Sequence, residues 1–250
     1  MGEAAALRSA LRSAVDGALA ILLAPACAAC REPLEEPTRG PVCARCWSAI
    51  VPLIPPCCRT CGDSLPSWRI ISVAESMCAR CRRRPPLLTA ARALGPYEGS
   101  LRDIVQALKY GARSTLARPL AARLRACGGD LLAGADAVVP IPLHRSRQRQ
   151  RGFNQAAEIA RHLGVPMLDA LRRTRRTASQ TDLPASRRHA NVRGAFALAP
   201  HASVADAIVV LVDDVSTTGA TLNACAAVLL TAGAREVRAL IVARALTRTR

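Results

Sequence analysis

The residues best suited to chemistry in this 250-residue chain lie in one short segment, from Asp213 to Thr221. Two adjacent carboxylates, Asp213 and Asp214, end an apolar run that starts at Ile208 and is typical of a strand buried on both faces. Four hydroxyl residues and a glycine follow, opening a segment with helical spacing. Carboxylates accept hydrogen bonds from sugar hydroxyls or hold Mg²⁺, and hydroxyls at a helix N-terminus bind phosphate. The segment therefore predicts a site for a phosphorylated sugar.

Other phosphate-binding loops fit this segment less well. The chain has no G-x-x-x-x-G-K-[ST] sequence and no G-x-G-x-x-G after a strand. A buried strand with a capped helix would explain one hydroxyl, but not two acids and four hydroxyls around a glycine. The segment resembles the ribose-phosphate loop of type I phosphoribosyltransferases, which bind phosphoribosyl pyrophosphate (PRPP). The resemblance implies that the two carboxylates face the ribose and that Ser216 to Thr221 surround the 5′-phosphate. The residues predicted to bind PRPP are Asp213, Asp214, Val215, Ser216, Thr217, Thr218, Gly219, Ala220 and Thr221.

A second charged segment follows a short apolar run from Ala137 to Ile141, which we expect to be a strand. Arginines stand at alternate positions in this segment, and their guanidinium groups suit the bidentate binding of a pyrophosphate. A solvated charged turn is the alternative interpretation. The predicted pyrophosphate loop contains Arg145, Arg147, Arg149 and Arg151.

Four C-x-x-C pairs occupy the first third of the chain. Two pairs separated by twelve to sixteen residues, twice over, are typical of zinc ribbons, in which four thiolates close a tetrahedral Zn²⁺ site. A redox role is the less favoured alternative, and a crossed arrangement of the same pairs stays open. We expect about two structural zinc ions per chain. The predicted ligands are Cys27, Cys30, Cys43 and Cys46 for one ion, and Cys58, Cys61, Cys78 and Cys81 for the other.

The elements that must position these residues alternate between helix and strand from Leu87 onward. Apolar residues predict helices over 101–108, 116–124 and 153–163, and strands over 137–141, 208–212 and 237–243. This order predicts an α/β fold with a parallel sheet flanked by helices, and both charged loops follow strands. We expect an amphipathic helix over 1–24, a double zinc ribbon over 25–86 and a phosphoribosyltransferase-like domain over 87–250.

The whole chain resembles the ComF family of competence-associated, phosphoribosyltransferase-like proteins. The matching segments are, in family order, the C-x-x-C pairs, Leu108 to Gly111, Pro140 to His144, Arg151 to Gln155, Gln180, Leu183, Arg187, Arg188, Asn191, Gly194 to Phe196, and Asp213 to Thr221. The resemblance implies zinc ribbons ahead of a type I phosphoribosyltransferase fold, with roles in natural transformation or DNA handling in some members. It also implies that residues 172–194 stand where such folds carry a flexible loop.

The charge of the chain fits a nucleic-acid partner. The formal net charge is +17, and twelve arginines stand against three acidic residues between Arg145 and Gly194. A solvated surface and a GC-rich genome are alternative explanations; we favour an anion-binding face. We expect PRPP with Mg²⁺, single-stranded DNA and other DNA-uptake proteins as partners. The predicted nucleic-acid contacts are Arg172, Arg173, Arg175, Arg176, Arg187 and Arg188.

Catalytic residues are not predicted. Some phosphoribosyltransferases that act on purines carry an aspartate at the place of Thr217, and acceptors usually stack on an aromatic ring near the last strand. This chain has no aromatic residue after Val237. The sequence favours phosphoribosyltransferase activity without establishing it. The alternative function is a metabolic enzyme that transfers ribose 5-phosphate to an unidentified acceptor and has no DNA role. No apolar run is long enough to span a bilayer, and paired cysteines that bind metal indicate a cytoplasmic protein.

Overall fold

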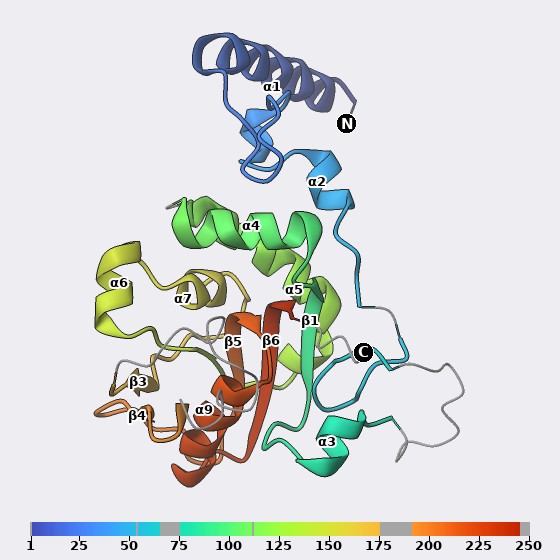
Figure 1. The fold of residues 1–250 in the computed structure, drawn as a ribbon. Helices are drawn as coiled ribbons and strands as arrows, with labels where there is room; N and C mark the ends of the chain where they lie inside the picture. The colour runs from blue at the N-terminus through green and yellow to red at the C-terminus, as the bar shows by residue number, and fades with distance from the viewer. Residues whose placement is uncertain (1, 54, 66–75, 112, 176–191, 246–250) are drawn as a thin grey trace.

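A computed structural model describes residues 2–53, 55–65, 76–111, 113–175 and 192–245 (Figure 1). Its centre is a four-stranded parallel sheet with the strand order β1-β6-β5-β2. The strands are β1 (Ala91–Pro96), β2 (Ala137–Pro140), β5 (Ile208–Ser216) and β6 (Glu236–Arg244). The predicted α/β class and parallel sheet are confirmed.

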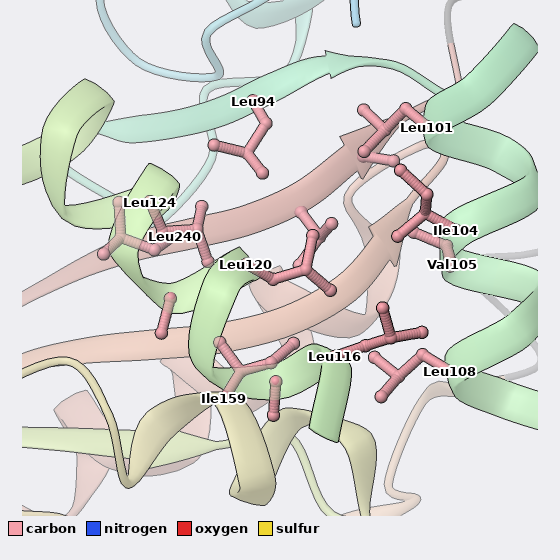
Figure 2. Close-up of a cluster of buried hydrophobic side chains, with 14 of the residues drawn as sticks. Leu94, Leu101, Ile104, Val105, Leu108, Leu116, Leu120, Leu124, Ile159 and Leu240 are labelled. Carbon is pink, nitrogen blue, oxygen red and sulfur yellow. The ribbon is translucent and has the colours of Figure 1, made fainter. Parts of the chain in front are cut away.

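Helices cover both faces of the sheet, because alternate residues of the central strands point to opposite sides. Val210 and Val212 of β5 pack under α4 (Gly99–Tyr110), α5 (Ala117–Leu132) and α7 (Gln155–Ala160). Figure 2 shows this cluster, with Leu101, Ile104, Val105 and Leu108 of α4 pointing toward α5 and the sheet. Val209 and Leu211 instead pack with α9 (Ala220–Thr231) and a hairpin of β3 (Leu171–Arg173) and β4 (Phe196–Leu198). The strands are therefore continuous apolar runs, as the sequence indicates.

The charged segment after β2 differs from the predicted loop. Arg145–Arg151 forms a helix, α6, which ends at Gly152. Arginine and glutamine are good helix formers, and the His144 ring caps the helix by accepting a hydrogen bond from the Ser146 amide at 3.3 Å. Gly152 adopts a left-handed conformation, with φ of 80°, that ends the helix. Alternate arginines consequently point to different sides of α6.

The helix expected over 153–163 is shorter in the structure. Asn154 caps α7 by accepting a hydrogen bond from the Ala156 amide at 3.1 Å, so the helix starts at Gln155. Turns follow Ala160, and Gly164 has a φ of +81°. The same Asn154 side chain donates to the carbonyl of Ile141 at 3.0 Å, which ties the start of α7 to the end of β2.

The cysteine-rich region contains α1 (Gly2–Leu23), η1 (Pro37–Arg39), α2 (Ala44–Ser48) and α3 (Ala79–Arg83). Helix α1 is held by Asp16, which accepts hydrogen bonds from the amide and hydroxyl of Thr38 at 2.8 and 3.0 Å. Figure 1 shows α1 and α2 beyond α4, whereas α3 lies at the opposite end, beside β1. Within the described ranges, no helix combines the length and hydrophobicity required to cross a membrane.

Candidate functional site

A cavity of about 550 Å³ opens where β5 ends, and it gathers charged residues from four separate elements. Asp213 and Asp214 come from the end of β5, and Thr217 and Thr221 from the turn and helix that follow. Helix α4 contributes Lys109 to the cavity wall. The charged residues on the cavity wall are Arg102, Lys109, Arg147, Arg151, Arg173, Asp213 and Asp214. A cavity lined by two carboxylates and five cations suits a polyanion that also carries hydroxyl groups.

The two carboxylates have different partners. Asp214 forms an ion pair with Lys109 at 3.0 Å, and the two side chains are 13% and 14% exposed. Asp213 Oδ1 accepts a hydrogen bond from the Asp214 amide at 2.9 Å. Burial and, to a smaller extent, the neighbouring Asp214 charge raise the pKa of Asp213 to about 8, against a smaller opposing effect of Lys109. The pair therefore combines an ion-paired carboxylate with one that is largely protonated at neutral pH.

The turn from Ser216 to Thr221 divides its residues between two sides. Thr217 and Thr221 line this cavity. Thr218 and Gly219 instead line a second cavity of about 480 Å³, which they share with Cys61 and Cys81 of the second zinc ribbon, the one that contains Cys58, Cys61, Cys78 and Cys81. Ser216 is buried, and its hydroxyl accepts a hydrogen bond from Arg244 at 3.2 Å. Gly219 has a φ of 78° and precedes the first turn of α9, whose amides have no partners within the helix.

Helix α6 places the four arginines of the predicted pyrophosphate loop on two different sides, two on each. Arg147 and Arg151 stand one turn apart and both line the cavity, whereas Arg145 and Arg149 are absent from its wall. Arg151 donates to the Gln155 side chain at 2.9 Å, and its guanidinium carbon lies 5.3 Å from the Tyr110 ring. Two of the four predicted arginines thus face the two carboxylates.

The strand β3 likewise separates two of the predicted nucleic-acid contacts. Arg172 is exposed and donates to the carbonyl of Leu198 at 3.2 Å. Arg173 points to the other side, lines the cavity and lies 5.2 Å from the Phe196 ring. Burial lowers the pKa of Arg173, and repulsion from Arg147 lowers it further, because both cations share this wall. Arg175 is exposed, while Arg176, Arg187 and Arg188 lie outside the described residues.

Sequence reasoning did not assign several residues of the cavity wall to the site, among them Lys109, Tyr97 and Tyr110. Lys109 is the only lysine of the chain, and this is the one feature of the sequence that could have marked it as a site residue. Tyr97 and Tyr110 place aromatic rings at the cavity, although no aromatic residue follows Val237 in the sequence. Tyr97 lies at the end of β1 and Tyr110 at the end of α4, so only the fold brings them to the site.

The structure gathers the cysteines into the two predicted sets of four. Within each set the sulfur atoms all lie within 4.8 Å of one another. The Cys30–Cys43 and Cys61–Cys78 sulfur distances are 3.9 and 3.7 Å. These exceed a disulfide bond of about 2.05 Å and match the sulfur–sulfur edge of about 3.8 Å in a tetrahedral zinc site with Zn–S bonds of about 2.3 Å.

Backbone amides also support the sulfur atoms, as second-shell hydrogen bonds do in zinc sites. The Cys43 amide lies 3.4 Å from Cys27 Sγ, and the Cys81 amide lies 3.4 Å from Cys78 Sγ. Each set therefore has the donor type, spacing and amide support that structural zinc requires.

Comparisons with known proteins match both halves of the chain. Residues 18–82 match the double zinc ribbon domain family, and residues 149–250 match the phosphoribosyl transferase domain family. Together with the two cysteine clusters, the first match indicates two zinc ions per chain. Among solved structures, a purine phosphoribosyltransferase from Pyrococcus horikoshii Ot3 aligns with 20% identity over 54% of this chain and 75% of its own, with a TM-score of 0.31.

Curated relatives match along most of their length. Competence protein F of Haemophilus influenzae is 31% identical over 235 residues, covering 88% of this chain and 96% of the relative. The DNA utilization proteins YhgH of Escherichia coli K12 and Salmonella typhi are 32% and 34% identical, each covering 88% of this chain and 97% of the relative. The chain therefore belongs to the ComF family, with a double zinc ribbon ahead of a phosphoribosyl transferase domain.

Proposed function

We propose that this protein binds PRPP together with Mg²⁺ in the cavity at the end of β5 and acts in DNA uptake or related DNA handling. One observation carries the first part: the Asp213–Asp214 pair shares a cavity with Arg147, Arg151 and Arg173. A ribose that carries phosphate groups is a ligand that needs carboxylates and cations at the same place. The names of the relatives, a competence protein and DNA utilization proteins, support the second part. We infer a cytoplasmic location, where PRPP and reduced thiols are available.

In this proposal each group has a separate task. Asp214 and Asp213, which would release its proton when Mg²⁺ binds, accept hydrogen bonds from the ribose hydroxyls and supply oxygen ligands to the ion. The first turn of α9, with Thr217 and Thr221, binds the 5′-phosphate. Arg147 and Arg151 bind the pyrophosphate and stabilise the charge that develops if it leaves. Lys109 of α4 holds the side chain of Asp214 through an ion pair, so the acidic pair stays in place before the ligand arrives.

Calorimetric titration with PRPP and Mg²⁺ tests this site. Asp213→Asn combined with Asp214→Asn should weaken PRPP binding at least tenfold, about the effect of losing one charge-assisted hydrogen bond. Asp206→Asn is a matched control, because Asp206 is exposed and precedes the opposite end of β5. Unchanged PRPP affinity in a folded double variant would rule out the site.

We also propose that the exposed arginines beside β3 contact single-stranded DNA through its phosphates. Arg172 and Arg175 are exposed, and the formal net charge of +17 favours such binding. Each neutralised phosphate should add about −0.7 to the log–log salt slope. Replacing Arg172, Arg175 and Arg176 with alanine should lower DNA affinity and flatten the slope by about two. Arg173 is left intact in this variant because it lines the PRPP cavity.

A second triple variant removes the same charge elsewhere. Arg118, Arg125 and Arg161 are exposed on α5 and after α7, remote from β3, and their replacement should change the slope by less. Anisotropy of a labelled oligonucleotide across a salt series measures both variants. Absent DNA binding near physiological salt, combined with turnover of PRPP with a small acceptor, would favour the metabolic transferase instead.

A further inference from the structure

The second zinc ribbon is connected to the proposed PRPP site by a chain of hydrogen-bonded side chains. Asp63 stands at its centre: Oδ1 accepts a hydrogen bond from Arg244 Nε at 2.5 Å, and Oδ2 accepts one from Arg80 Nη2 at 2.7 Å. On the ribbon side, Arg80 Nη2 also lies 3.5 Å from the sulfur of Cys61. On the other side, Arg244 Nη1 donates to the hydroxyl of Ser216 at 3.2 Å. The path therefore runs from a zinc-binding cysteine to the residue at which β5 passes into the phosphate-binding turn.

Arg244 can occupy this position only with a counter-ion. Its side chain is 2% exposed, and a guanidinium buried to this degree needs a partner of opposite charge. Asp63 is the carboxylate that bonds to it, across 181 positions of sequence. Among the described residues, Arg244 Nη2 is buried without a hydrogen-bond partner. The hydrogen bonds of Arg244 to Asp63 and Ser216 must therefore offset the free-energy cost of burying the charge. Loss of Asp63 would leave Arg244 with Ser216 alone.

The backbone strengthens this connection at both ends. Ser216 and Arg244 are paired in register as the last residues of β5 and β6, and the Ala245 amide donates to the Ser216 carbonyl at 2.9 Å. On the ribbon side, Gly62 has a φ of +74°, and a Cβ atom there would lie 2.8 Å from the carbonyl oxygen of Ala91. Only glycine allows the ribbon to approach β1 this closely and to present Asp63 to Arg244.

The two parts also face each other across one cavity. The wall of the cavity of about 480 Å³ includes Cys61 and Arg80 from the ribbon and Thr218 and Gly219 from the turn. The first ribbon is placed differently, because Cys27, Leu34, Val42 and Cys46 belong to the same buried cluster as the apolar residues of α4. Between the first ribbon and Ser216, Thr218 or Gly219, no hydrogen bond or ion pair is found within the described ranges.

We propose that Asp63 and Arg244 are positioning residues for the phosphate-binding turn, and that the second zinc ribbon stabilises the turn through them. The inference rests on the proposed PRPP function but makes a separate structural claim. A folded ribbon holds Arg80 against Cys61 and thereby fixes Asp63 between two arginines. Asp63 then holds Arg244, and Arg244 holds the Ser216 hydroxyl, so the turn keeps the conformation that a phosphate requires. The first ribbon stabilises the protein without acting on the turn.

A thermodynamic cycle tests the path. Asp63→Asn keeps the shape of the side chain but removes the charge, and it should weaken PRPP binding about fivefold to tenfold, the range that charge-assisted hydrogen bonds give. Ser216→Ala should have an effect of the same order, and the double variant should be no weaker than the weaker single variant, because both changes break one path. Asp130→Asn, which removes the partner of an exposed Arg92 ion pair, is the control and should leave affinity unchanged.

Hydrogen exchange of the amides from Thr217 to Leu222 gives a readout that needs no ligand. We expect faster exchange in Asp63→Asn than in wild type, with zinc content unchanged at about two ions. If wild type binds no PRPP, the proposed function is wrong, yet the exchange measurement still decides this inference. A folded, zinc-loaded Asp63→Asn variant with wild-type exchange in the turn would overturn it.

A matched pair of cysteine variants tests the role of the metal. Cys43 and Cys78 are equivalent, since each is partly buried and precedes a five-residue helix in its ribbon. Cys43→Ser and Cys78→Ser should each lower the zinc content to about one ion. Only Cys78→Ser should weaken PRPP binding and accelerate exchange in the turn. Equal effects of the two variants would contradict a specific path, and if Cys78→Ser fails to fold, Asp63→Asn decides.

Discussion

Asp213 and Asp214 are neighbours in sequence, but their surroundings give them different properties. Lys109 compensates the charge of Asp214 at 3.0 Å, whereas Asp213 is partly buried beside that carboxylate and its pKa is raised to about 8. Folding therefore binds a proton to Asp213 at neutral pH, because the unfolded chain keeps the ordinary value near 3.8. This proton uptake has a measurable consequence for stability.

Asp213→Asn should stabilise the protein at alkaline pH. Between the unfolded and folded pKa values the native state binds more protons than the unfolded chain, so wild-type stability falls as pH rises toward 8. Asparagine cannot ionise and removes this loss. From pH 6 to 8.5 the stability of the variant should gain about 2–3 kcal/mol relative to wild type. Urea unfolding at the two pH values measures the gain, and a pH-independent difference would contradict the raised pKa.

The arginines of α6 allow a comparison in which the charge removed is constant. Arg147→Ala with Arg151→Ala should weaken PRPP binding at least tenfold, because both side chains line the cavity. Arg145→Ala with Arg149→Ala removes the same charge from the same helix and should weaken binding less than threefold, through long-range electrostatics alone. Calorimetry at physiological salt separates the two variants. Equal losses would mean that the helix contributes only its net charge.

At the scale of elements, the strands β2, β5 and β6 and the helices α4, α5 and α9 could be predicted from sequence, because each buries an apolar face, whereas β1 was not predicted. Helix α6 could not, since it has no buried residue and no apolar period to reveal it. This helix forms because the His144 ring caps its start, arginine and glutamine have high helix propensity, and Gly152 ends it. The sequence also did not reveal that Arg172 and Arg173 point to opposite sides of a strand, because β3 is only three residues long. Short elements are defined by their ends and their neighbours, and these are tertiary features.

Gly152 supplies a test of the α6 boundary. A Cβ atom at this position would meet nothing within 4 Å, so the left-handed φ of +80° is the only obstacle to a side chain. Gly152→Ala should therefore cost about 1–2 kcal/mol of stability. It should also weaken PRPP binding by shifting Arg151 against its Gln155 partner. Gly129→Ala in α5, also with open space, is the control and should not destabilise.

At the scale of the whole molecule, the two zinc ribbons differ in what else holds them together. The first contributes four buried residues to the core that α4 and α5 share with the sheet, and Arg123 of α5 stacks 3.7 Å over the Trp47 ring. In the described part of the second ribbon, the buried apolar cluster consists of Cys58, Cys61 and Cys81 themselves. The sequence shows equivalent C-x-x-C pairs in both, so this difference follows only from where the fold places them. The Asp63–Arg244 pair was equally invisible, because its members are far apart in the chain and unremarkable in type.

This difference predicts that the second ribbon releases its zinc first. Where thiolate ligands form most of the core, the metal supplies most of the folding free energy and local opening exposes it to a chelator. We expect about two zinc ions in purified protein and a biphasic release under excess chelator, with one ion lost per phase. Cys43→Ser should retain only the fast phase and Cys78→Ser only the slow one. A single phase in wild type would show that the ribbons are equally protected, and protein that contains no metal but disulfide-linked cysteines would refute the zinc assignment itself. Because the second ribbon also holds Arg244, the loss of PRPP affinity should coincide with the fast phase of zinc release. The slow phase should cause no further change in PRPP affinity.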